Sequence, residues 1–113
     1  MLWILEKFSQ VKMEKLVEIE KLSIGFRNQN KSLNIVKSIS FDIPKGKTVA
    51  LVGESGSGKT ITALSILKLL PYPSAFHDSG KIIYKKQNIL SFDNDKIQKI
   101  RGKNITAIFQ EPM

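Results

Sequence analysis

The sequence predicts an α/β fold that begins with an antiparallel β part and continues into the start of a parallel-sheet core. Two segments in which apolar and polar residues alternate, 16–26 and 35–43, predict half-buried strands. A continuous apolar run within 48–52 predicts a strand that is buried on both faces, as in a parallel sheet. A glycine-rich loop and an apolar-faced helix over 60–70 follow it directly. A buried strand joined to a helix in this way is typical of α/β proteins.

The remaining elements are expected to be short and complete the order β-β-β-α-β-α-β. They are a hairpin loop, a turn, a strand, a helix and a final strand, at 27–34, 44–47, 81–89, 93–101 and 104–109. In the second helix Asp93 is the expected N-cap, Ile97 and Ile100 share one face, and Gly102 follows the C-terminus. The parallel sheet would then hold only the strands at 48–52 and 104–109, so its core is predicted to be incomplete.

Composition narrows the classes of function. The 113 residues include 18 basic and 10 acidic side chains, a formal net charge of +8, and no cysteine. Disulfide scaffolds and cysteine-ligated zinc sites are therefore excluded, and no apolar run is long enough for a membrane-spanning helix. The basic excess fits a nucleic-acid or anionic membrane partner. A solvated lysine-rich surface is favoured, because sixteen of the eighteen cations are lysine.

The loop between the buried strand and the first helix carries the clearest chemistry. It reads Gly-Glu-Ser-Gly-Ser-Gly-Lys-Thr and matches G-x-x-x-x-G-K-[ST] at every fixed position. Glycines let backbone N–H groups approach phosphate closely, and the following helix N-terminus favours negative charge. A flexible Gly-Ser linker is disfavoured, because periodic elements frame the loop on both sides. We predict a nucleotide triphosphate site formed by Gly53, Glu54, Ser55, Gly56, Ser57, Gly58, Lys59 and Thr60.

Two residues of this loop are predicted to contact the nucleotide or its metal ion through their side chains. Lys59 is expected to reach the β- and γ-phosphates, and Thr60 is expected to place its hydroxyl on Mg²⁺. The expected cofactors are therefore ATP and Mg²⁺.

Several segments resemble one family within the P-loop NTPases. They resemble the ATP-binding subunits of ABC transporters, specifically the peptide, oligopeptide and nickel importer group, in the runs LVGESGSGKT at 51–60 and IFQEPM at 108–113. The segments 22–27 and 62–71 look closest to microcin C-type peptide importers with two fused ATPase domains. The resemblance covers 14–113 and less than half of a family ATPase domain. It implies the N-terminal part of an ABC ATPase fold, cut after the Q-loop, with 1–13 as an N-terminal extension and Met1 or Met13 as the translation start.

The resemblance also implies roles for two further residues. Phe26 matches the family aromatic that stacks on adenine, although a hairpin core position explains it equally well. Gln110 matches the Q-loop glutamine, which coordinates Mg²⁺ or orients water, so Lys59 and Gln110 are the implied catalytic residues. The segment 111–113 would begin the contact with membrane subunits. His77 does not match the family's switch histidine and is expected to face solvent.

The function implied is an ATP-binding subunit that couples ATP binding and hydrolysis to uptake of peptides or related small solutes. Its implied partners are integral membrane permease subunits, a second ATPase domain in a dimer or fused tandem and, indirectly, a periplasmic or extracellular solute-binding protein. The implied location is peripheral, at the cytoplasmic face of the cell membrane. The family's L-S-G-G-Q signature, its Asp-Glu pair and its switch histidine do not occur in these residues, so this chain alone is expected to be catalytically incomplete.

Two alternatives to a working importer subunit remain open. They are a non-transport ABC-type ATPase in DNA repair or translation, and an inactive remnant of a transporter gene. A nucleic-acid-binding module is suggested by basic residues at Lys81, Lys85, Lys86, Lys96, Lys99, Arg101 and Lys103. No aromatic stacking motif accompanies them, so a solvated face or one near anionic lipid headgroups is favoured, with no nucleic-acid partner.

Overall fold

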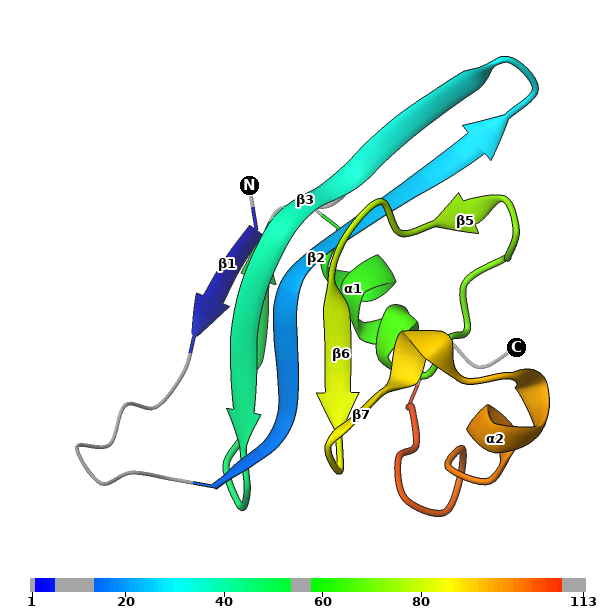
Figure 1. The fold of residues 1–113 in the computed structure, drawn as a ribbon. Helices are drawn as coiled ribbons and strands as arrows, with labels where there is room; N and C mark the ends of the chain where they lie inside the picture. The colour runs from blue at the N-terminus through cyan, green and yellow to red at the C-terminus, as the bar shows by residue number, and fades with distance from the viewer. Residues whose placement is uncertain (1, 6–13, 54–57, 109–113) are drawn as a thin grey trace.

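The computed structural model describes residues 2–5, 14–53 and 58–108, which form two β-sheets and two short α-helices (Figure 1). The elements in chain order are β1 (Leu2–Leu5), β2 (Lys15–Asn28), β3 (Lys31–Pro44), β4 (Ala50–Gly53), α1 (Lys59–Ile66), β5 (Ala75–Phe76), β6 (Lys81–Tyr84), β7 (Gln87–Asn88), the 3₁₀ turn η1 (Ile89–Ser91) and α2 (Asn94–Gln98). Neither helix of the described residues is long and apolar enough to cross a membrane.

The larger sheet is antiparallel and confirms the predicted β part of the fold. Its strand order is β3-β2-β6-β7, and β5 also pairs with β2. In β2 the buried positions change from Val17 and Ile19 to Leu22 and Ile24, across a register shift beside Lys21. A bulge inserts one unpaired residue, which resets the two-residue alternation. The shift therefore keeps the apolar side chains of a long strand on one face.

The loop predicted at 27–34 is wrong in extent, because the β2–β3 hairpin continues through most of it. Asn28 pairs with Lys31, so the turn contains only Gln29 and Asn30. Figure 1 shows this end of the hairpin projecting beyond the rest of the sheet, and Leu33 there is 64% exposed. A strand exposed on both faces carries polar residues as a loop does, which explains why the sequence reads as one.

The strand predicted at 81–89 is also divided. β6 ends at Tyr84, and Lys85 and Lys86 form a tight turn into β7, with Tyr84 paired to Gln87. Both lysines have positive φ, 50° and 63°. Such two-residue turns usually contain asparagine or glycine. The sequence therefore gives no local signal for this turn.

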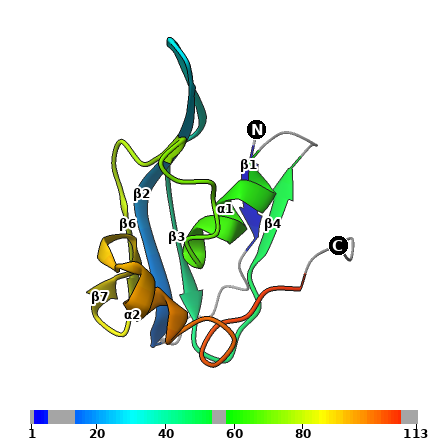
Figure 2. The ribbon, with the colours of Figure 1, turned by 90° about the vertical axis from the view of Figure 1, so that its right-hand side faces the viewer.

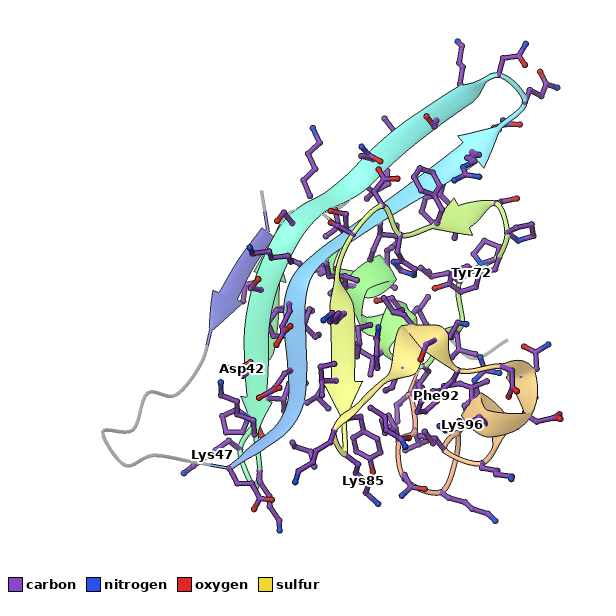
Figure 3. The ribbon with its side chains drawn as sticks, in the orientation of Figure 1. Asp42, Lys47, Tyr72, Lys85, Phe92 and Lys96 are labelled. Carbon is purple, nitrogen blue, oxygen red and sulfur yellow. The ribbon has the colours of Figure 1, made fainter. Side chains whose placement is uncertain are left out.

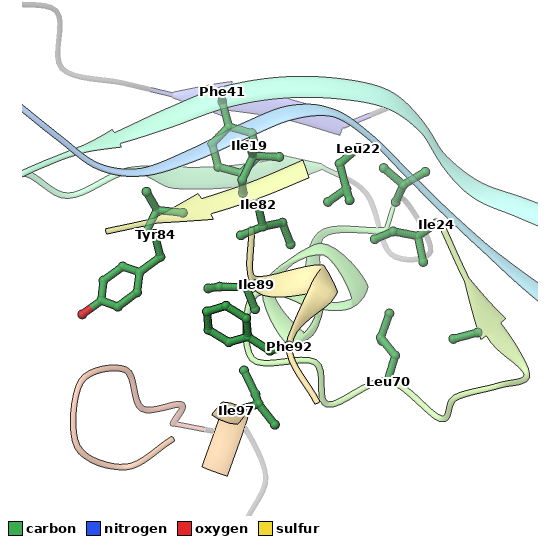
Figure 4. Close-up of a cluster of buried hydrophobic side chains, with 13 residues drawn as sticks. Ile19, Leu22, Ile24, Phe41, Leu70, Ile82, Tyr84, Ile89, Phe92 and Ile97 are labelled. Carbon is green, nitrogen blue, oxygen red and sulfur yellow. The ribbon is translucent and has the colours of Figure 1, made fainter. Parts of the chain in front are cut away.

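The hydrophobic core lies between the larger sheet and the segments that follow α1 and β7 (Figure 4). Its buried residues come from the sheet, from the end of the α1 segment and from the η1–α2 region: Val17, Ile19, Leu22, Ile24, Val36, Phe41, Leu70, Ala75, Ile82, Tyr84, Ile89, Phe92 and Ile97. Residues separated widely in the sequence thus close one core against a single face of the sheet.

The predicted second helix is confirmed in a shorter form. It spans Asn94–Gln98, and the Asp93 carboxylate accepts a hydrogen bond from Lys96 N at 2.8 Å. Ile97 is buried, as the pattern predicts, and Gly102 has the positive φ of 79° that suits a position after a helix end.

The smaller sheet differs from the predicted parallel core. β4 pairs antiparallel with β1, in a register that places Leu2 opposite Gly53. Val52 is 43% exposed, so this strand is not buried on both faces. The strand expected at 104–109 is not present over 104–108, where Ile105 makes one parallel bridge to Arg101, and Phe109 lies outside the described residues. An apolar run favours a strand, but its burial depends on covering layers, and within the described residues β4 has only β1 as a strand partner.

Helix α1 lies between the two sheets, as Figure 2 shows. It ends at Ile66, earlier than predicted, and Lys68 beyond it has a positive φ of 52°. The predicted apolar face is present, since Ile61, Leu64 and Ile66 pack partly buried against the core. Ala63 is exposed, however, and the fully buried helix residues are Thr62 and Ser65. The hydroxyl groups donate to helix carbonyls, Thr62 to Gly58 O and Ser65 to Thr62 O, both at 2.7 Å. Small side chains with internal hydrogen bonds therefore pack closely beside the apolar residues of this helix.

Candidate nucleotide-binding site

The site is built where β4 passes into α1. Gly53 ends β4, Gly58 is the N-cap of α1, and Lys59 is its first residue. Gly58 has a φ of +96°, and a Cβ there would lie 2.7 Å from Val36 Cγ2. Both the backbone conformation and the close approach of β3 therefore require glycine at this position. The other predicted loop residues, Glu54, Ser55, Gly56 and Ser57, lie outside the described residues.

Lys59 connects the two ends of the loop. Its partly buried Nζ donates a hydrogen bond to Gly53 O at 2.6 Å. Its ammonium group therefore lies at the end of β4, beside the N-terminus of α1. No described side chain caps that terminus, and no acidic residue lies in its first turn. The helix dipole and the lysine together create a positive field at the loop, which suits a polyanion.

A concave pocket of about 490 Å³ opens beside this lysine. Lys59 and Thr60 supply its polar groups, and its other walls are mostly apolar, from Val49, Leu51, Ala63, Leu64, Ala107 and Ile108. The pocket thus combines a cationic end with an apolar lining. Such a combination can orient a ligand that has a charged part and a flat apolar part.

The donor set also fits a magnesium ion that arrives with phosphate. Thr60 is exposed on the first turn of α1 and offers a hard oxygen ligand next to Lys59. The described residues contain no cluster of three or more His, Cys, Asp or Glu side chains that would hold a metal independently. Mg²⁺ commonly takes one or two protein ligands and completes its shell with phosphate oxygens and water. When bound there, the ion would neutralise phosphate charge.

The remaining predicted site residues are not brought to this pocket by the described structure. Phe26 lies in β2, pairs with Leu33 and Ala75, and packs half-buried against the core. It does not line the pocket beside Lys59, and its stacking on adenine stays a prediction. Gln110 lies outside the described residues, so its catalytic and Mg²⁺-binding roles also stay predictions.

The sequence predicts that His77 faces solvent, and this prediction is wrong. The ring is half-buried, with Nδ1 3.0 Å from Ser23 O and Nε2 within hydrogen-bond distance of the Tyr72 hydroxyl. Burial lowers the pKa of His77, the Ser23 hydrogen bond opposes this, and the charge of Lys68 adds to the lowering. Burial also raises the pKa of Tyr72 to about 12. His77 thus ties β2 to the segment after α1, and no sequence signal links it to a partner 54 residues away.

Comparison with known families agrees with this geometry. The sequence model of the ABC transporter family matches residues 36–113, which include β4, the loop and α1. The chain therefore belongs to the ABC transporter family, and its fold is the N-terminal part of an ABC ATPase domain.

Individual relatives indicate the group of ABC transporters to which the chain is similar. The chain is 48% identical over 100 residues to the peptidoglycan transport ATP-binding protein YejF of Agrobacterium fabrum, covering 88% of this chain and 18% of that protein. It is 35% identical over 103 residues to the oligopeptide transport ATP-binding protein OppD of Bacillus subtilis, covering 91% of this chain and 29% of that protein. For the dipeptide transport ATP-binding protein DppD of Bacillus subtilis the identity is 40% over 101 residues, covering 89% of this chain and 30% of that protein.

These relatives confirm the resemblance that the sequence motifs carry. The chain groups with the ATP-binding proteins of peptide and oligopeptide ABC transporters. It spans 18% to 30% of the length of the three relatives.

Proposed function

We propose that this chain supplies the ATP-binding part of an ABC importer subunit that energises uptake of peptides or related small solutes. The observation that carries the proposal is the position of Lys59 at the N-terminus of α1. Its Nζ donates a hydrogen bond to Gly53 O, at the other end of the phosphate-loop motif. The names of the three relatives refer to peptidoglycan, oligopeptide and dipeptide transport, which supports a peptide-like solute.

ATP would bind with its phosphates against the loop and the start of α1. The Lys59 ammonium would exchange the Gly53 carbonyl for β- and γ-phosphate oxygens, which are stronger partners because they are charged. Thr60 would hold Mg²⁺ through its hydroxyl. Gln110 would contribute a neutral amide oxygen to Mg²⁺ or to water, and Phe26 would stack on adenine. The apolar pocket wall at Leu51 and Leu64 would exclude water from the phosphate end.

The chain would act within a larger assembly. Its proposed partners are integral membrane permease subunits, a second ATPase domain and, indirectly, a solute-binding protein, with the chain at the cytoplasmic face of the membrane. The phosphate loop supplies groups that bind ATP, but the residues present include no Asp-Glu pair to activate water. We therefore propose that these 113 residues bind ATP and depend on further elements for hydrolysis.

Substitution of the loop lysine tests the proposal directly. Lys59→Ala removes the cation that contacts two phosphates, so MgATP affinity should fall by about a hundredfold or more. Titration calorimetry of the full chain with MgATP measures the change.

The matched control is Lys31→Ala, which removes an exposed lysine at the tip of the β2–β3 hairpin. This variant should bind MgATP as the parent chain does. Unchanged affinity in Lys59→Ala, with a normal circular dichroism spectrum, would show that the loop does not bind nucleotide.

A further inference from the structure

The β6–β7 turn presents two lysines in an unfavourable backbone conformation. Lys85 and Lys86 are the two turn residues, and their φ values are 50° and 63°. Residues with a Cβ rarely adopt this left-handed region, and a two-residue hairpin usually places asparagine and glycine there. Strain of this kind is retained where function requires particular side chains. The strain therefore points to a function for the two adjacent cations of this turn.

Three further lysines lie in the neighbouring segments. Figure 1 places the β6–β7 turn and α2 in the lower part of the molecule, with the segment that follows α2 between them, and Figure 3 shows Lys85 and Lys96 there. We use the term lysine cluster for the exposed residues Lys85, Lys86, Lys96, Lys99 and Lys103. Lys86 adjoins Lys85 in the turn, and Lys99 and Lys103 follow Lys96 closely in sequence, so positive charge gathers around the turn and α2.

Buried aromatic rings hold two of these ammonium groups at the surface. Lys85 Nζ lies 5.4 Å from the ring centroid of Tyr84, and Lys96 Nζ lies 4.4 Å from that of Phe92. The two rings are themselves only 7% and 5% exposed. A cation over a ring face is attracted to it and needs no carboxylate partner. The rings thus fix the position of these charges without neutralising them.

Acidic partners do not neutralise the lysine cluster within the described residues. The ion pairs there join Lys15 and Lys45 to acidic side chains and include none of the five lysines. Asp95 directly precedes Lys96 in α2 and forms no ion pair with the five lysines in the described part of the chain. Asp93 accepts the backbone N–H of Lys96 as the α2 cap. The five lysines outnumber Asp93 and Asp95, so this region keeps a net positive charge that is available to an external anion.

We propose that the lysine cluster binds the surface of an anionic lipid bilayer. An extended surface fits better than a small anion, because none of the five lysines lines the pocket beside Lys59. A bilayer fits better than nucleic acid, because lysine contacts lipid headgroups as a point charge, and Tyr84 and Phe92 are too buried to stack on bases. The proposal rests on the proposed function, since an importer subunit works beside a membrane.

The test compares binding of the full chain to two kinds of vesicle. One is phosphatidylcholine alone, and the other contains phosphatidylglycerol in addition. The variant Lys85→Asn with Lys86→Gly removes two charges and installs residues that the turn prefers, so it should unfold at no lower a temperature than the parent. The control Lys31→Gln with Lys37→Gln removes two exposed lysines from β3 and lowers the net charge of +8 by the same amount.

Sedimentation with the vesicles should separate the variants. The parent should bind vesicles that contain phosphatidylglycerol and not phosphatidylcholine alone, with weakening as salt rises. The turn variant should bind about thirtyfold less, because each surface lysine contributes about a fivefold factor, and the control should bind as the parent does. Equal binding by the turn variant, equal loss in the control, or binding of the parent to duplex DNA but not vesicles would overturn the proposal.

The outcome is separable from that of the ATP experiment. The turn variant should bind MgATP with parental affinity, since its lysines lie outside the nucleotide pocket. Conversely, Lys59→Ala should bind vesicles as the parent does. Failure of the lipid proposal would therefore leave the nucleotide proposal standing, and failure of the nucleotide proposal would be seen in calorimetry alone.

Discussion

The larger sheet and the β4–α1 unit are held in contrasting ways. Strand β2 and its neighbours bury Leu22, Ile24 and Ile82 completely. In β4 no residue is buried, and the two fully buried residues of α1 are Thr62 and Ser65. Complete apolar burial thus stabilises the sheet, whereas the β4–α1 unit packs against the core with partly buried apolar side chains and two buried hydroxyl groups. Elements that bind ligands are commonly less stable than the scaffold beside them, and the division here follows that pattern.

A cavity in the larger sheet is the strongest test of whether apolar burial stabilises it. Ile82→Ala should lower the free energy of unfolding by about 3 kcal/mol, because the side chain is wholly buried at the centre of the core and leaves a void. Urea unfolding followed by circular dichroism measures the change.

The neighbouring residue provides the control. Ile83 follows Ile82 in β6 and is only partly buried on the opposite face. Ile83→Ala should therefore cost clearly less than Ile82→Ala. Equal losses in the two variants would mean that the core does not lie on a single face of this sheet.

A smaller effect is expected at the joint between the two regions, where His77 connects β2 to the segment after α1. Because burial lowers its pKa in the folded state, the unfolded chain binds more protons near pH 6.5. The stability that neutral His77 provides is complete above its ordinary pKa of 6.5 and falls as pH drops through that value toward the lowered one. Urea midpoints measured through this range should decrease with falling pH.

Substitution of the same residue isolates this effect. His77→Gln keeps an amide that can hydrogen bond to Ser23 O and Tyr72, and it removes the titration. His77 is the chain's single histidine, so the stability change around pH 6.5 should flatten in the variant. An unchanged slope would show that His77 is equally accessible to protons in both states.

Local signals explain what the sequence could predict. The Asp93 cap acts within three positions, so it is visible without tertiary structure. The phosphate-loop motif is likewise defined by its own residues, and its binding of nucleotide stays a prediction. The Ser23 contact of His77 joins residues 54 positions apart, and the Lys85–Lys86 turn contains neither glycine nor asparagine. The first feature depends on how distant segments meet, and the second depends on backbone strain. No periodicity or turn residue in the sequence indicates either of them.

The smallest expected effect concerns Val52, where the sequence pattern and the structure differ most. A strand buried on both faces would place this side chain in a core, whereas β4 leaves it 43% exposed. Val52→Thr keeps the β-branched shape and adds one hydroxyl, so at an exposed site it should change the free energy of unfolding by less than about 0.5 kcal/mol. In a buried strand the hydroxyl would lack a partner and cost roughly 1–3 kcal/mol. Urea unfolding therefore distinguishes the two arrangements, and a large loss would show that β4 is covered like the larger sheet.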